Sequence, residues 1–126
     1  MGVRGIGGTK ERAFEQAALA VTGVITDLLL VRAERQVELC CSAPDDELLL
    51  ADWLNAVIYE MTVCRMLFSR FEVKLEGNEL HAKAYGEPVE GARHRPAVEV
   101  KGATYTALSV RPLAGGGWLA QCVVDV

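Results

Sequence analysis

The last residues of the chain carry the groups whose chemistry is easiest to interpret from type and spacing. Asp125 and the α-carboxylate of Val126 follow an apolar run that begins at Cys122, so a strand here would bring two carboxylates close together. Adjacent carboxylates repel unless a cation lies between them, and oxygen donors suit a hard ion such as Ca²⁺ or Mg²⁺. A hydrated, frayed chain end is the alternative, and spacing alone favours it.

A second pair of charges lies in the string Glu99-Val-Lys101. In a strand, Glu99 and Lys101 would share one face, while Val98 and Val100 would share the other. Taken alone, this pattern is typical of a solvated face with an exposed ion pair worth at most about 1 kcal/mol.

Other reactive residue types lack the neighbours that a catalytic or metal site needs. Asp52 lies in the middle of a predicted helix beside Trp53, where a structural and a functional role are both open. His81, in a predicted strand, and His94, in a charged loop, have no nearby Ser or Cys in an activation motif, so we expect ordinary surface or loop residues. Cysteines without a Cys-x-x-Cys pair favour buried thiols over a zinc site. They are Cys40, Cys41, Cys64 and Cys122.

Composition limits the classes of function. Thirteen Lys and Arg against seventeen Asp and Glu give 13 − 17 = −4 at pH 7, which disfavours direct binding to RNA or DNA. No aliphatic run approaches the roughly 18 residues that span a bilayer, and the N-terminus lacks the apolar core of a signal peptide. We therefore expect a cytoplasmic protein without a membrane partner.

The 126 residues, 51% of them hydrophobic, predict a single domain over residues 1–126.

Hydrophobic periodicity predicts two helices. From Thr9, a good N-cap, apolar residues recur at helical spacing as far as Ile25, with Glu15 among the polar residues that would face water. Acidic residues at the start of a second apolar stripe predict a helix from about Asp45 to Cys64.

Alternation and β-branched residues predict the strands, and short connections favour antiparallel pairing between them. Gly5, Gly7 and Gly8 are expected to turn the chain into the first helix, because left-handed backbone angles are easiest for glycine. The stretch 87–96 is expected to be a loop. The order predicts an α+β fold, with two amphipathic helices packed on a mostly antiparallel sheet. The predicted strands are Val3 to Ile6, Gln36 to Cys41, Ser69 to Leu75, Glu79 to Tyr85, Val98 to Val110 and Trp118 to Val126.

Several strings, taken together and in order, resemble the archease family, whose members activate the tRNA-splicing RNA ligase. Each string is weak alone, but the combination is specific and covers almost the whole chain. The strings are Ala13-Phe-Glu-Gln-Ala-Ala-Leu-Ala20 with Ile25-Thr-Asp27, Asp52-Trp-Leu-Asn55, Ala84-Tyr-Gly-Glu-Pro88, Glu99-Val-Lys-Gly-Ala-Thr-Tyr105 and Val124-Asp-Val126.

The resemblance implies a protein that is not itself the ligase. Archeases help a partner that joins RNA ends through a guanylylated histidine, so RNA is expected to be met only through the ligase. The family carries a divalent cation, reported as calcium, and the resemblance places ligands at Asp125 and Val126. It also nominates Lys101 as an activating residue, with Asp52 as a further candidate whose role is either functional or structural.

The resemblance also implies one departure. The family's N-terminal motif would place a further metal-binding Asp immediately before the position of Met1. Either the start of the chain is assigned too late, which we favour because Gly2-Val-Arg-Gly5 continues the family's first strand, or the metal site is weakened. Two other functions stay open: a stand-alone metal-dependent hydrolase or nuclease using Asp125 with Lys101 or His94, and a general protein chaperone.

Overall fold

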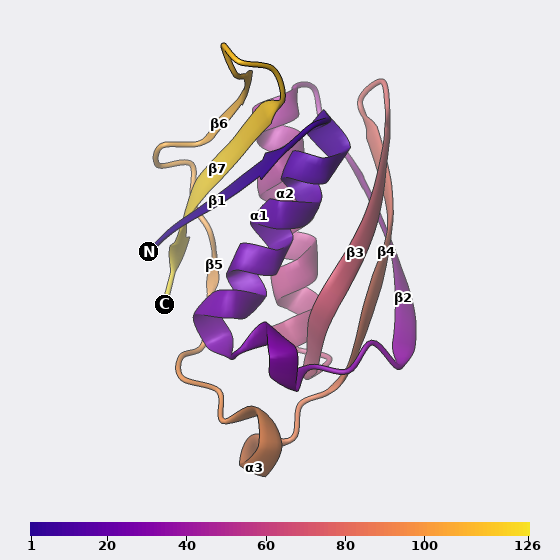
Figure 1. Ribbon diagram of the computed structural model, residues 1–126, viewed down its shortest axis with the longest axis vertical. Coiled ribbons are helices and arrows are strands. Elements are labelled where there is room, and N and C mark those ends of the chain that lie inside the picture. Colours follow the sequence, from indigo (N-terminus) through magenta and orange to yellow (C-terminus); the bar gives the residue numbers. More distant parts are fainter.

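The computed structural model describes residues 1–126 and has three layers, with two helices enclosed between two antiparallel sheets (Figure 1). The α+β class, the two long helices and the antiparallel pairing are as predicted. No helix is long and apolar enough to cross a membrane.

Both helices begin where side-chain caps predict. α1 spans Lys10–Ile25, and the Thr9 hydroxyl accepts a hydrogen bond from the backbone N–H of Arg12. α2 spans Asp46–Thr62, and the Asp45 carboxylate accepts one from the backbone N–H of Leu48. These bonds satisfy backbone donors that have no partner within the helix.

The first sheet joins the two ends of the chain. β1 (Gly2–Gly7) runs antiparallel to β7 (Trp118–Asp125), with Gly2 opposite Val123 and Gly7 opposite Trp118. Two short strands, β5 (Gly102–Ala103) and β6 (Ser109–Pro112), also pair with β7.

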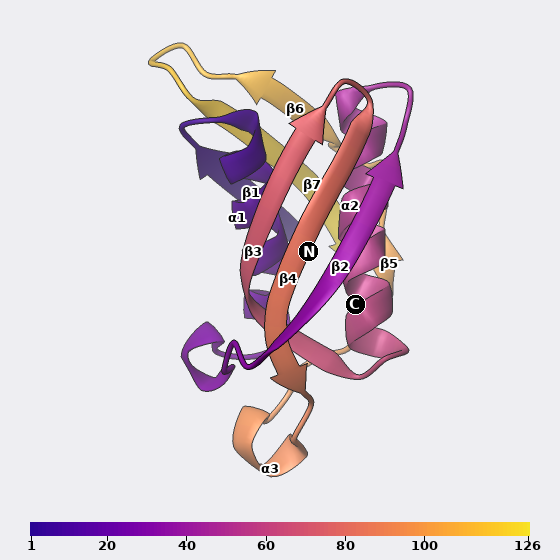
Figure 2. The same ribbon diagram turned by 90° about the vertical axis from the view of Figure 1, so that its right-hand side faces the viewer.

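The second sheet has the order β2-β4-β3 and lies on the other side of the helices (Figure 2). β2 spans Arg35–Ser42, β3 spans Met66–Glu76 and β4 spans Glu79–Pro88. The predicted hairpin between β3 and β4 is confirmed, and its turn uses Gly77 with a φ of 60°.

The prediction of a single sheet is wrong in this respect, because the strands divide between two. Both helices have a broad buried face, with eight buried residues each, which is wide enough to be covered by more than one sheet. α1 contacts β1 and β7 of one sheet and β3 of the other, and α2 contacts strands of both. One core therefore serves both sheets, and Trp53 lies fully buried in it.

Glu15 is buried and does not face water as predicted. Its carboxylate accepts hydrogen bonds from the backbone N–H of Val73 on β3, at 2.9 Å, and from the Arg12 guanidinium, at 2.7 Å. A buried carboxylate is tolerated because it is paired in this way.

The predicted turn into the first helix lies at Gly8, where the chain bends before α1, but Gly5 and Gly7 lie within β1 and neither has a positive φ. A Cβ at Gly5 would overlap the backbone of Ala13 and Ala17. These glycines let β1 lie directly against α1.

The predicted strand Val98 to Val110 is mostly not a strand. Only Gly102–Ala103 and Ser109–Pro112 pair with β7, and the chain leaves the sheet between them through Ala107, whose φ is 53°. The expected loop 87–96 contains a helical turn, α3 (Gly91–His94), and a three-residue helix η1 (Leu28–Leu30) follows α1.

Candidate functional site

The pairing of β5 with β7 brings together residues that are far apart in the sequence. The backbone N–H of Lys101 donates to the carbonyl of Asp125 at 2.8 Å, and Gly102 lies opposite Asp125. The side chains of Lys101, Asp125 and Val126 are all exposed. The structure therefore places three of the four predicted site residues at one end of the first sheet.

The N-terminus lies at the same end of this sheet (Figure 1). The ammonium of Met1 donates to the carbonyl of Val124 at 3.1 Å, and the backbone N–H of Val124 donates to the Met1 carbonyl at 2.8 Å.

Two further residues hold the backbone that follows Lys101. The Asn55 side-chain oxygen on α2 accepts from the backbone N–H of Ala103 at 2.9 Å, and both the N–H and hydroxyl of Thr104 donate to the carbonyl of Val123. The backbone that presents Lys101 is therefore fixed from the helix as well as from the sheet. The role of Asn55 was missed by sequence reasoning, although an exposed amide three residues after Asp52 on one helix was a usable signal.

Lys101 lies at the end of a segment, residues 89–101, that crosses from the second sheet to the first. Val100 is buried, the backbone N–H of Ala97 donates to the carbonyl of Ile25, and the backbone N–H of Val89 donates to the carbonyl of Arg65. The segment is therefore held at Val89 by the connection between α2 and β3 and at Ala97 by the end of α1.

A buried carboxylate anchors the start of this segment. Glu87 accepts hydrogen bonds from the backbone N–H of Arg32 at 2.6 Å, from both terminal nitrogens of Arg93, and from the His94 ring at 3.1 Å. The Arg93 guanidinium is the main cause that lowers the pKa of Glu87 to about 2. The carboxylate thus stays ionised although it is 4% exposed.

His94 is buried, so the prediction of an ordinary loop residue is wrong. Its Nδ1 accepts from the backbone N–H of Glu90 at 2.8 Å, which leaves the proton on Nε2 to donate to Glu87. The backbone carbonyl of His94 accepts from the buried hydroxyl of Thr26. No sequence spacing indicated this cluster, because its members come from the ends of β4 and α1 and from α3.

Asp52 is exposed on α2. It interacts with a residue of β2 in the second sheet and not with the residues around Lys101. Burial of Cys41 on β2 is the main cause that raises the pKa of its thiol to about 11, and the negative charge of Asp52 is the second cause. The structure does not connect it with Lys101 or Asp125 by any hydrogen bond or ion pair.

The residues present fit a divalent cation only in part. The carboxylates of Asp125 and Val126 are hard oxygen donors, but Ca²⁺ takes about six to eight. No group of three or more His, Cys, Asp and Glu side chains is placed to hold a metal ion.

The expectation of buried thiols holds for one of the four cysteines. Cys122 is buried and Cys41 is half-buried, but Cys40 and Cys64 are exposed.

The fold and this site define a small α+β protein in which two helices lie between two sheets, and an exposed lysine and the last two residues of the chain share one sheet end. The archease protein family (MTH1598/TM1083) matches residues 1–126. The chain belongs to this family.

Individual relatives agree with this assignment over nearly full length. The archease of Pyrococcus furiosus is 35% identical over 130 residues, covering 100% of this chain and 92% of that protein. The archease of Methanosarcina mazei is 39% identical over 125 residues, covering 95% and 85%.

Solved structures are similar in fold. The solution structure of protein 1598 of Methanobacterium thermoautotrophicum has a TM-score of 0.79 and 30% identity, covering 99% of this chain and 89% of that one. A crystal structure of an archease from Thermotoga maritima, described as a possible chaperone, has a TM-score of 0.66 and 20% identity, covering 100% and 90%.

Proposed function

We propose that this protein activates a tRNA-splicing RNA ligase, promoting guanylylation of the ligase and repeated turnover, and does not itself catalyse ligation. Membership of the archease family over the whole chain supports the proposal. The observation that carries it is the pairing of β5 with β7, in which the backbone N–H of Lys101 donates to the carbonyl of Asp125 and so holds the exposed Lys101 at the sheet end where the last two residues lie.

Lys101 is the residue to which we assign the activating role. Its ammonium is exposed and takes part in none of the ion pairs of the protein, so it is free to meet a partner. A lysine acts on a phosphate or a nucleotide as a mobile point charge, whereas the backbone that carries it stays in place. The ammonium would enter the ligase active site, where guanylylation needs positive charge near the phosphates.

The charge of the protein supports contact with RNA only through the ligase. A net charge of −4 gives no general attraction to a polyanion.

We propose Asp125 and the Val126 carboxylate as part of the ligand set for a divalent cation. A bound cation would supply positive charge at this end of the first sheet. Without it, these residues present two negative charges at the sheet end that also carries Lys101.

A ligation assay tests the proposal. Purified ligase at catalytic concentration, GTP and RNA with joinable ends are mixed with this protein or with its Lys101→Ala variant. We expect the parent to raise the number of turnovers and the variant to lose most of that gain, while the single-turnover reaction of the ligase alone is unchanged. Lys101 is exposed, so the substitution should change the free energy of unfolding by no more than about 0.5 kcal/mol.

Lys83→Ala is the matched control, since Lys83 is also an exposed lysine but lies on the second sheet. If both variants stimulate the ligase as well as the parent does, Lys101 is an ordinary surface lysine and the proposed role is wrong. If the parent itself gives no gain, the activator function is refuted.

Two alternatives have distinct outcomes in simple assays. A nuclease would cleave RNA in the absence of ligase when Mg²⁺ or Ca²⁺ is supplied, and Asp125→Ala would abolish cleavage. A general chaperone would suppress aggregation of an unrelated unfolding protein. The description of the Thermotoga maritima relative as a possible chaperone makes the second assay worth running.

A further inference from the structure

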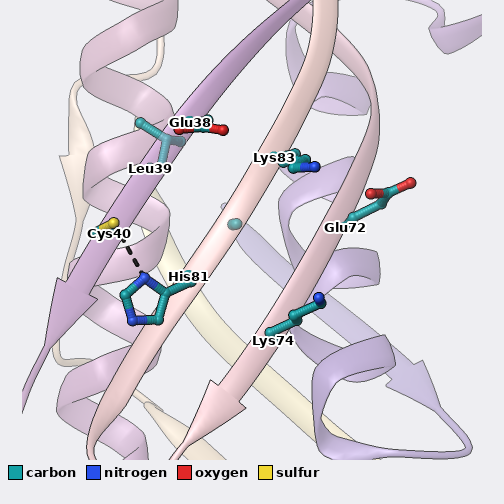
Figure 3. Close-up of a pocket in the computed structure, with 8 residues that line it drawn as sticks. Glu38, Leu39, Cys40, Glu72, Lys74, His81 and Lys83 are labelled. Carbon is teal, nitrogen blue, oxygen red and sulfur yellow. Dashed lines mark hydrogen bonds between the residues drawn. The ribbon is translucent and has the colours of Figure 1, made fainter.

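The outer face of the second sheet carries a hollow that the proposed function does not use (Figure 3). It has a volume of about 280 Å³ and lies over the middle of β2, β4 and β3. Its charged and reactive side chains alternate with inward-facing residues such as Leu80 and Ala82, which are buried in the core. The reactive and charged residues that line it are Glu38, Cys40, Glu72, Lys74, His81 and Lys83.

Cys40 and His81 form a pair within this hollow. They lie directly opposite each other in the β2–β4 register, and Cys40 Sγ is 3.4 Å from His81 Nδ1 (Figure 3). On the other side of the ring, Nε2 is 3.5 Å from a carboxylate oxygen of Glu79. Glu79 favours the tautomer with its proton on Nε2, and Nδ1 is then free to accept the thiol proton. The order carboxylate, imidazole, thiol is the one in which a base activates a nucleophile.

The other three thiols of the chain lack this arrangement. Burial, followed by the charge of Asp52, raises the pKa of Cys41 to about 11. Cys64 is exposed, but the Glu60 side chain beside it raises its pKa. Burial also raises the pKa of Cys122, whose Sγ donates to the carbonyl of Thr104 at 3.1 Å. Cys40 is thus the exposed thiol with a base beside it, and the same chain supplies three internal controls.

The charges around the pair indicate which reagents the hollow favours. Lys74 lies opposite His81 on β3, and Lys83 is the next outward-facing residue along β4. Neither ammonium has a carboxylate within 4.0 Å, whereas Glu72 is paired with Arg70 at 2.6 Å. Glu38 lies directly opposite Lys83 on β2, so the hollow holds two carboxylates as well as two ammonium groups that form no ion pair. These ammonium groups can pair with a small molecule that bears carboxylates.

We propose that Cys40 is a site of reversible thiol–disulfide exchange with low-molecular-weight disulfides that carry carboxylate groups. The thiol proton passes to His81 Nδ1, and the thiolate attacks one sulfur of the reagent disulfide. The S–S bond of the reagent breaks as the new bond to Cys40 Sγ forms, and the departing thiolate takes the proton from His81. One disulfide and one thiol are consumed, and one mixed disulfide and one small thiol are produced.

The test measures rates of modification by glutathione disulfide at each cysteine, using mass spectrometry of peptides. A Cys41→Ser background makes the assignment to Cys40 unambiguous. We expect Cys40 to react at least about fivefold faster than Cys64. His81→Gln should lower the rate at Cys40 without changing the rate at Cys64. Cys122 stays unmodified as long as the fold is intact, so it reports unfolding in every variant.

A second reagent tests the role of charge. Lys74→Gln combined with Lys83→Gln should slow the reaction of Cys40 with glutathione disulfide but not with cystamine, a disulfide that carries ammonium groups. If Cys40 reacts no faster than Cys64, or if His81→Gln leaves the ratio of the two rates unchanged, the proposal is overturned. If the lysine substitutions slow both reagents equally, or neither, the preference for carboxylates is wrong. No ligase is present, so these outcomes are independent of the proposed function.

Discussion

Replacing Glu87 by glutamine should destabilise the protein in a way that depends on pH. The substitution keeps the size of the side chain but removes the negative charge that Arg93 and His94 contact. The pKa of Glu87 falls from 4.5 to about 2 in the folded protein. At about 1.4 kcal/mol for each unit, the ionised carboxylate contributes about 3 kcal/mol. Arg93 is itself 27% exposed, and water screens part of this interaction, so we expect Glu87→Gln to cost about 2 kcal/mol at pH 7.

The sign of the pH dependence follows from the direction of the pKa change. Because the pKa of Glu87 is lower in the folded than in the unfolded protein, its contribution is fully present above about pH 4.5 and is lost as the pH falls towards 2. The other acidic residues are the same in parent and variant, so the difference between the two proteins reports the loss of the Glu87 carboxylate.

The assay is urea unfolding of parent and variant between pH 7 and pH 2, followed by circular dichroism. Glu90→Gln is the control, since Glu90 also pairs with Arg93, at 3.1 Å, but its side chain is 66% exposed. We expect that variant to stay within about 0.5 kcal/mol of the parent. A difference for Glu87→Gln that is below about 0.5 kcal/mol at pH 7, or that does not shrink as the pH falls, would refute the reasoning.

Two further outcomes follow from the core and from the carboxylates of the first sheet. Trp53→Ala should lower the free energy of unfolding by about 3 to 5 kcal/mol in chemical denaturation, because Trp53 is fully buried, packs edge-on against Phe71 and donates to the carbonyl of Phe14 at 3.0 Å. A variant as stable as the parent would contradict this packing. In titration calorimetry the 126-residue chain should bind Ca²⁺ weakly, because Asp125 and Val126 supply only two carboxylates. Tight binding that survives Asp125→Ala would show that Asp125 is not a ligand.

The sequence by itself determined the elements whose causes are local. Thr9 and Asp45 cap the helices through backbone groups three residues away, so their positions were predictable. The hairpin around Gly77 was predictable for the same reason, since its turn joins neighbouring strands. For the site, the resemblance to a family nominated Lys101 and Asp125, but spacing alone favoured ordinary surface roles for both.

Only the tertiary structure decided which elements meet. The division into two sheets depends on how β1 and β7, from opposite ends of the chain, pair on one side of the helices. The burial of Glu15 and His94 depends on partners that lie far away in the sequence, Val73 for the first and Thr26 for the second.

The meeting of Lys101 with Asp125, and of Cys40 with His81, likewise depends on strand register. Hydrophobic periodicity fixes which face of a strand is buried, but it does not specify the partner strand or the residue opposite. Those are set by how the whole chain closes around one core, because each pairing must also satisfy the packing of both helices.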